Sequence, residues 1–144
     1  MEIERKFLVK KLPEHLEAYP CLLIEQAYLC TDPVVRVRRQ NDDYYMTYKG
    51  RGLMEREEYN LPLNAEAYAH LKAKADGRAI TKKRCLIPLG DLTVELDIFS
   101  SPSGLVLAEV EFPTRETALS FTPPEWFGED VTEDVRYHNS NMIF

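Results

Sequence analysis

The sequence predicts a mainly β domain of the α+β class, organised as an antiparallel sheet. Eight segments read as strands, and seven of them place charged residues at every second position with largely apolar residues between them, as two-faced strands do. Short turns join most of these segments, which favours antiparallel pairing. The 144 residues contain no repeat, low-complexity tract or linker, so we expect one domain over residues 1–144.

The predicted strands are separated by turn signals. Asp32 and Pro33 stand between the second strand and the third, and residues 41–43 turn the chain into a hairpin. Pro62 is expected to end the fifth strand, and residues 88–91 are expected to turn the chain after the sixth. The strands are predicted at residues 1–9, 22–31, 34–40, 44–50, 54–61, 79–87, 92–99 and 105–112.

Two short helices are expected beside the strands. Asn64 is a suitable N-cap for a helix over residues 65–75, which Gly77 would stop. Thr114 can cap a second helix that ends near residue 121, because two prolines follow it. The first two strands are separated by a polar stretch with room for one or two helical turns.

The composition excludes some classes of function. A net charge of −6 argues against a nucleic-acid binder, although a local basic pocket remains compatible with it. No apolar run is long enough to cross a membrane, and no signal peptide precedes the charged N-terminal motif. We therefore expect a cytoplasmic protein that does not bind membranes.

The cysteines and histidines show no metal-ligand spacing. The three cysteines are odd in number, and we expect reduced thiols that only pack: Cys21, Cys30 and Cys85. The three histidines are expected at the surface: His15, His70 and His138.

Seven of the eight predicted strands carry charged residues along one face, and the opposite faces are largely apolar. The basic members of these faces are Lys6, Arg36, Arg38, Lys49, Arg56, Lys82 and Arg84. The acidic members are Glu2, Glu4, Glu58, Glu95, Asp97, Glu109 and Glu111.

Two arrangements of the sheet satisfy this pattern. In a sandwich, the charged faces point to solvent and the apolar faces form the core. In a closed barrel, the charged faces point inward and the apolar faces lie outside under helices, which is unusual because buried charges need partners. The periodicity alone leaves both arrangements open.

The types of charged residue point to phosphate and metal chemistry. Arginines recur at two-residue spacing, which suits a bidentate grip on phosphate oxygens. Glutamates recur at the same spacing, and paired carboxylates suit hard divalent cations. Because the basic and acidic members balance, bound Mg²⁺ or Mn²⁺ would restore the positive excess that a polyphosphate needs.

These motifs, in this order, resemble the CYTH domain, also called the triphosphate tunnel metalloenzymes. The Pro-Pro-x-Trp-Phe-Gly stretch at 123–128 is similar to the short bacterial single-domain members. The sequence departs from the family at Cys85, because family members often have an aromatic residue directly after the Lys-x-Arg element. The Cys85 side chain is expected on the outer face of the strand. The resemblance is carried by Glu2-x-Glu4-x-Lys6, Arg36-x-Arg38, Lys49, Arg56 to Tyr59, Lys82 with Arg84, Glu95 to Asp97, Glu109 to Phe112 and Thr132 to Tyr137.

The resemblance implies an eight-stranded antiparallel closed β-barrel with a few flanking helices, forming a tunnel. It implies a triphosphate-containing substrate bound by Lys6, Arg36, Arg38, Lys49, Arg56 and Arg84. It implies Mg²⁺ or Mn²⁺, with two ions expected, on Glu2, Glu4, Glu109 and Glu111, with Asp97 and Glu58 as second choices. Glu95 is expected only to orient a basic residue.

Tyr28 and Lys82 match a tyrosine–lysine pair of the family. From the residues, Tyr28 is either an ordinary strand tyrosine, which the sequence alone favours, or a general base whose pKa the neighbouring Lys82 ammonium would lower. Asp134 and Arg136 are expected to be structural and to close one mouth of the tunnel.

The resemblance favours a metal-dependent hydrolase that cleaves inorganic tripolyphosphate to pyrophosphate and orthophosphate. Two alternatives remain: a nucleotide or thiamine triphosphate enzyme, such as a class IV adenylate cyclase or a triphosphatase, and a non-catalytic polyphosphate-binding module. No stretch is dedicated to binding a base. The oligomeric state is expected to be a monomer or a homodimer.

Overall fold

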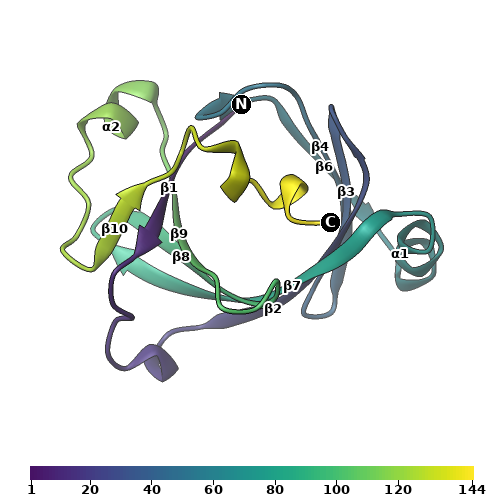
Figure 1. The fold of residues 1–144 in the computed structure, drawn as a ribbon, viewed down its shortest axis with the longest axis horizontal. Helices are drawn as coiled ribbons and strands as arrows, with labels where there is room; N and C mark the ends of the chain where they lie inside the picture. Colours follow the sequence, from purple (N-terminus) through teal and green to yellow (C-terminus); the bar gives the residue numbers. More distant parts are fainter.

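A computed structural model describes residues 1–144, which form ten antiparallel strands and two α-helices (Figure 1). The strands are β1 (Glu2–Val9), β2 (Cys21–Thr31), β3 (Val34–Gln40), β4 (Asp43–Lys49), β5 (Glu55–Arg56), β6 (Glu58–Leu63), β7 (Asp76–Leu89), β8 (Leu92–Ser101), β9 (Val106–Glu111) and β10 (Phe127–Asp130). The helices are α1 (Ala65–Lys72) and α2 (Arg115–Ser120), with 3₁₀ turns η1 (Leu16–Ala18), η2 (Val135–Tyr137) and η3 (Asn139–Asn141).

The sheet closes into a barrel, as expected. Hydrogen bonding runs in the order β1-β9-β8-β7-β2-β3-β4-β6, and β5 returns to pair with β1. The closing contact is short, because only Glu2 with Arg56 and Ile3 with Glu55 are paired. Since β5 and β6 are two parts of the strand predicted at 54–61, the ring corresponds to the eight predicted strands.

The tenth strand was not expected from the sequence. β10 pairs with the C-terminal end of β1, whereas β5 pairs with the N-terminal end of β1. It has four residues and two adjacent charges, so it lacks the alternation that identified the others.

Several predicted element ends were wrong. Pro62 lies inside β6 opposite Tyr45, which is possible because β6 is an edge strand there and its backbone nitrogen needs no partner. Pro88 similarly lies inside β7. Asn64 does cap α1, but the helix ends at Lys72, and Gly77 belongs to β7.

The larger apolar core lies outside the barrel wall, which excludes the sandwich. On one side, α2 and the segment around Trp126 cover the outer faces of β1, β7, β8 and β9 (Figure 1). On another side, Tyr68 of α1 packs on Ala27 and Val37. The residues of the first core are Phe7, Cys85, Ile87, Val94, Leu96, Ala108, Val110, Phe112, Ala118 and Phe127.

The C-terminal tail, residues 131–144, crosses the ring of strands and fills one end of its interior (Figure 1, yellow). Asp134 and Arg136, which were expected to be structural and to close a mouth, pair with each other at 2.6 Å, and Arg136 is exposed. Met142 and Ile143 provide an apolar closure. They pack against residues on the inner faces of three strands: Ile80, Phe99 and Leu107.

Candidate active site

The barrel encloses a polar cavity of about 360 Å³. Period-2 alternation explains its lining, because each strand turns its charged positions to the same side. Of the fourteen residues expected to bind substrate, bind metal or act in catalysis, only Asp97 is absent from the cavity wall. The residues brought together are Glu2, Glu4, Lys6, Tyr28, Arg36, Arg38, Lys49, Arg56, Glu58, Lys82, Arg84, Glu109 and Glu111.

Arg36 and Arg38 form a basic wall without any carboxylate partner. Both side chains are buried, and neither takes part in a salt bridge. Arg38 donates to Gln26 Oε1 at 2.6 and 2.9 Å, whereas Arg36 makes only a 3.3 Å bond to Thr47 and its buried Nε has no partner. Burial lowers the pKa of Arg38, and the charge of Arg36 lowers it further. This wall therefore carries uncompensated positive charge.

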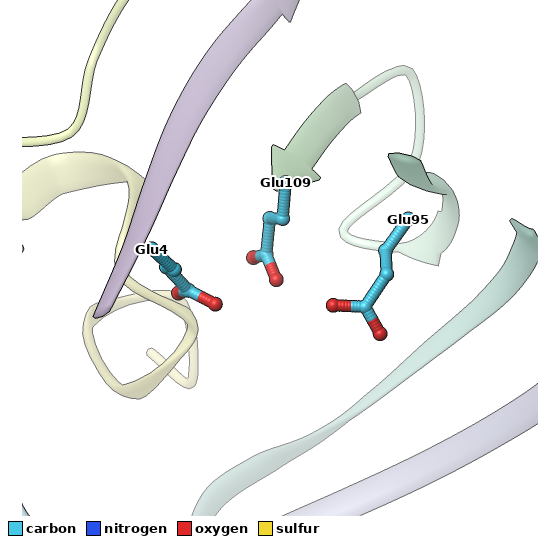
Figure 2. A group of neighbouring side chains, drawn as sticks. All are labelled: Glu4, Glu95 and Glu109. Atoms are coloured by element: carbon cyan, nitrogen blue, oxygen red, sulfur yellow. The ribbon is translucent and has the colours of Figure 1, made fainter. Parts of the chain in front are cut away.

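Glu4, Glu95 and Glu109 form an acidic cluster on β1, β8 and β9 (Figure 2). Each carboxylate offers an oxygen within 4.8 Å of the other two. Burial raises the pKa of Glu4, and the charge of Glu109 adds to that effect. Burial also raises the pKa of Glu95 to about 7. Three converging carboxylates at this spacing fit a divalent cation, so Glu95 is also a candidate ligand. Its Oε2 accepts from Arg84 Nη1 at 2.8 Å, which agrees with the orienting role expected of it.

Two further carboxylates, Glu2 and Glu58, lie where the barrel closes. Both contact Lys49 Nζ, at 3.0 and 3.3 Å respectively. Burial raises the pKa of Glu2 to about 8, and the charge of nearby Glu4 acts in the same direction. Glu111 is paired in register with Glu4 and is exposed at the cavity rim. These carboxylates extend the acidic wall from the cluster toward solvent.

Asp97 lies behind the wall as a counter-ion. Its two oxygens contact Arg84 Nε at 2.7 Å and Lys82 Nζ at 2.8 Å, and it is fully buried. Burial lowers the pKa of Lys82 to about 7, although the charge of Asp97 opposes this shift. Asp97 therefore positions the Lys82 ammonium and the Arg84 guanidinium in the cavity wall.

Tyr28 and Lys82 both line the cavity, but no hydrogen bond joins them. The Lys82 ammonium donates to Asn139 Oδ1 at 3.0 Å. Gln26 Nε2 donates to the same oxygen at 3.2 Å and to the Tyr28 hydroxyl at 2.9 Å. The two expected catalytic residues are thus connected only through Gln26 and Asn139.

Neither Gln26 nor Asn139 was predicted from the sequence to be a functional residue. Gln26 carried a signal, because it lies two residues before Tyr28 on the inward face of a predicted strand. Asn139 carried none, because it comes from an irregular tail. The tail also supplies the carbonyl oxygen of Tyr137, which accepts from Lys6 Nζ at 2.9 Å. The half-buried His138 lies between these two positions rather than on the surface.

A closed antiparallel barrel with arginines and carboxylates on its inner wall defines a class of phosphate-handling folds, and the sequence comparisons agree with that class. The CYTH domain model matches residues 1–118. The chain belongs to the CYTH domain family. The matched residues end within α2, so β10 and the tail lie beyond them.

Two relatives cover nearly the whole chain. An inorganic triphosphatase from Nitrosomonas europaea is 43% identical over 98% of this chain and 95% of its own. An inorganic triphosphatase from Acetivibrio thermocellus is 38% identical over 99% of this chain and 92% of its own.

Solved structures give the same fold. The crystal structure of the inorganic triphosphatase NE1496 matches with a TM-score of 0.73 and 38% identity, covering 99% of this chain and 94% of that one. A putative adenylate cyclase from Bacillus halodurans matches with a TM-score of 0.63 over 94% of this chain and 97% of that one. At 17% identity, this second likeness concerns the fold alone. No helix of the protein has the length and apolar character needed to span a membrane.

Proposed function

We propose that this protein hydrolyses inorganic tripolyphosphate to pyrophosphate and orthophosphate inside the barrel. The observation that carries the proposal is the pair of buried arginines, Arg36 and Arg38, which face the cavity without a carboxylate partner. A buried charge without a counter-ion is costly, and a polyanionic ligand would supply that counter-ion. The two relatives named inorganic triphosphatase support the same assignment.

The remaining basic residues are proposed to bind the substrate after exchanging partners. Each of the four forms an ion pair with a cavity carboxylate: Lys6, Lys49, Arg56 and Arg84. When a cation occupies the carboxylates, these side chains become free to contact phosphate oxygens. Asp97 keeps Arg84 and Lys82 aligned during this exchange.

Glu4, Glu95 and Glu109 are proposed to hold the first Mg²⁺ or Mn²⁺ ion, because their oxygens converge. Glu2, Glu58 and Glu111 are the candidate ligands of a second ion. The ions would neutralise charge on the phosphates and polarise the reacting phosphoryl group. The high pKa values of Glu2, Glu4 and Glu95 fit sites that need a cation to stay ionised.

Tyr28 is proposed to hold the attacking water and to accept its proton. Gln26 fixes the phenol hydroxyl, and Asn139 fixes the Lys82 ammonium on the same side of the cavity. Hydrolysis at a terminal phosphorus requires a water opposite the leaving group, and two fixed polar groups can hold it there. We also propose a single domain, a cytoplasmic location and a monomer or homodimer.

The decisive experiment measures phosphate release from tripolyphosphate, ATP and thiamine triphosphate with Mg²⁺, Mn²⁺ and Ca²⁺. We expect tripolyphosphate to be the best substrate and activity to require Mg²⁺ or Mn²⁺. Arg38→Gln should abolish most of the activity, whereas Arg51→Gln should not, because Arg51 is exposed and pairs with Asp32. Preference for ATP or thiamine triphosphate would contradict the proposed substrate, and binding without turnover would contradict the proposed reaction.

A further inference from the structure

Two cysteines face each other across the outer wall of the barrel. Cys21 of β2 and Cys85 of β7 are paired in register, and their sulfur atoms are 2.9 Å apart. Both are free thiols. The 64 residues that separate them in sequence make this contact a product of the fold.

The backbone places Cys21 and Cys85 at a position of the sheet where a disulfide can form. Next to it, the Leu86 amide donates to the Pro20 carbonyl at 2.9 Å, so Cys21 and Cys85 occupy a site without direct hydrogen bonds between them. Antiparallel partners at such sites have Cα atoms about 4.5 Å apart, and their side chains approach most closely. A disulfide spans Cα separations of about 4.4–6.8 Å, so it can form here without strand displacement.

The two thiols differ in access. Cys85 is fully buried within the outer core, and burial raises its pKa to about 11. Cys21 is half-buried, and its sulfur also contacts the Tyr19 carbonyl at 3.5 Å. An oxidant therefore reaches Cys21 first, and Cys85 is the neighbour that can complete the reaction.

We propose that Cys21 and Cys85 form a dithiol oxidation site, at which a hydroperoxide converts two thiols into a cross-strand disulfide between β2 and β7. In the first step, the Cys21 sulfur takes one oxygen from the hydroperoxide, which is reduced to water or an alcohol. In the second step, the Cys85 sulfur attacks the resulting sulfenic acid. The S–O bond breaks, and the departing hydroxide combines with the Cys85 proton as a second product, water.

The link would join two strands that carry the cavity wall. Leu22 is the register partner of Arg84, so the disulfide would lie one position away from that arginine. β2 also carries Gln26 and Tyr28, and β7 carries Lys82. Oxidation would therefore fix β2 to β7 behind the cavity, while thiol reductants would release the connection.

The third cysteine provides a control within the chain. Cys30 lies on β2 opposite Val35, whereas the other two cysteines are paired with each other. The structure thus predicts one specific link and no link that includes Cys30.

The test treats the folded protein with hydrogen peroxide under native conditions, blocks the remaining thiols, and maps the peptides by mass spectrometry. We expect a linked peptide pair containing Cys21 and Cys85, together with a higher thermal unfolding midpoint that dithiothreitol reverses. The Cys30→Ser variant should form the same link. Cys21→Ser should prevent it and leave Cys85 unoxidised.

The Cys85→Ala variant separates oxidation chemistry from folding. It should take up oxygen at Cys21 without forming a link, while its cooperative unfolding reports that the barrel is intact. Wild-type protein that gains only sulfenic or sulfinic groups on Cys21, or that forms links through Cys30, would overturn the proposal.

Discussion

The Lys82 ammonium donates to Asn139 Oδ1 at 3.0 Å, which connects a barrel strand to the C-terminal tail inside the cavity. The same oxygen accepts from Gln26, so Asn139 holds the cavity-lining Lys82 and the buried Gln26. Beyond the residues that match the CYTH model, the tail therefore takes part in the architecture of the candidate active site.

Replacing Asn139 by alanine should lower kcat/KM for tripolyphosphate by about 10- to 100-fold. The reason is that Lys82 and Gln26 lose a shared acceptor, and hydrogen bonds to charged groups contribute about 1.5–3 kcal/mol. Steady-state kinetics would measure the change, with Asn141→Ala as control, because Asn141 is exposed in the same 3₁₀ turn. Equal losses in both variants would indicate a general effect of the tail.

Tyr28→Phe should lower kcat by about 10²–10⁴-fold with little change in KM, because acid–base assistance is made mainly in the transition state. The substitution keeps the ring and removes the hydroxyl that Gln26 fixes. Tyr59→Phe is the matched control, since that ring is 58% exposed. A loss below about tenfold is no larger than the loss of one ordinary hydrogen bond can cause. Such a result would mean that Tyr28 only packs in the barrel.

Glu95→Gln should raise the Mg²⁺ or Mn²⁺ concentration needed for half-maximal activity by at least about tenfold, because it removes the charge of one candidate ligand from the cluster. Glu111→Gln should have a smaller effect, since Glu111 is exposed at the rim. Glu57→Gln, which lies outside the cavity wall, should have none. Calorimetric metal titration gives a readout that does not depend on turnover. Unchanged metal affinity in Glu95→Gln would mean that Glu95 only orients a basic residue.

Glu25→Gln should destabilise the protein by about 1 kcal/mol at pH 7, a value reduced for partial exposure. Burial favours protonation of Glu25, but hydrogen bonds from Lys72 and Tyr68, at 2.8 and 2.7 Å, prevail and lower its pKa. A lowered folded-state pKa contributes stability above the unfolded pKa, and that stability is lost as the pH falls through the folded value.

The difference between wild type and Glu25→Gln should therefore shrink in acid, below about pH 4. Urea unfolding at several pH values measures it. Glu14→Gln is the control, because Glu14 is exposed and forms no salt bridge. A difference that stayed constant with pH would mean that the ionised carboxylate contributes nothing specific.

Gly77→Ala should destabilise the protein more than Gly90→Ala. Both glycines have positive φ, 63° and 60°, so both substitutions carry the cost of a left-handed alanine, about 1–2 kcal/mol. A Cβ at Gly77 would also collide with the carbonyl of Ile143, whereas Gly90 faces open space. Overpacking adds about 1–3 kcal/mol, and displacement of the tail should reduce activity as well. Equal unfolding free energies in the two variants would contradict the role of Gly77 in docking the tail.

Much of the cavity was predictable from local pattern. Alternation along a strand is a property of the backbone, so Arg36 and Arg38 had to share one face, as did Glu109 and Glu111. Residue type then indicated phosphate and metal chemistry on that face. The helix cap at Asn64 is also local, and the structure contains it.

Only the tertiary structure decided which of these residues meet. Asp97 and Glu95 lie on the same face of one strand and both contact Arg84, yet only Glu95 lines the cavity and converges with Glu4, whereas Asp97 lies behind the wall. That difference depends on the stagger between neighbouring strands, which alternation within one strand does not encode. The position of Asn139 depends on how Met142 and Ile143 fill the end of the barrel, and such packing arises between segments far apart in sequence.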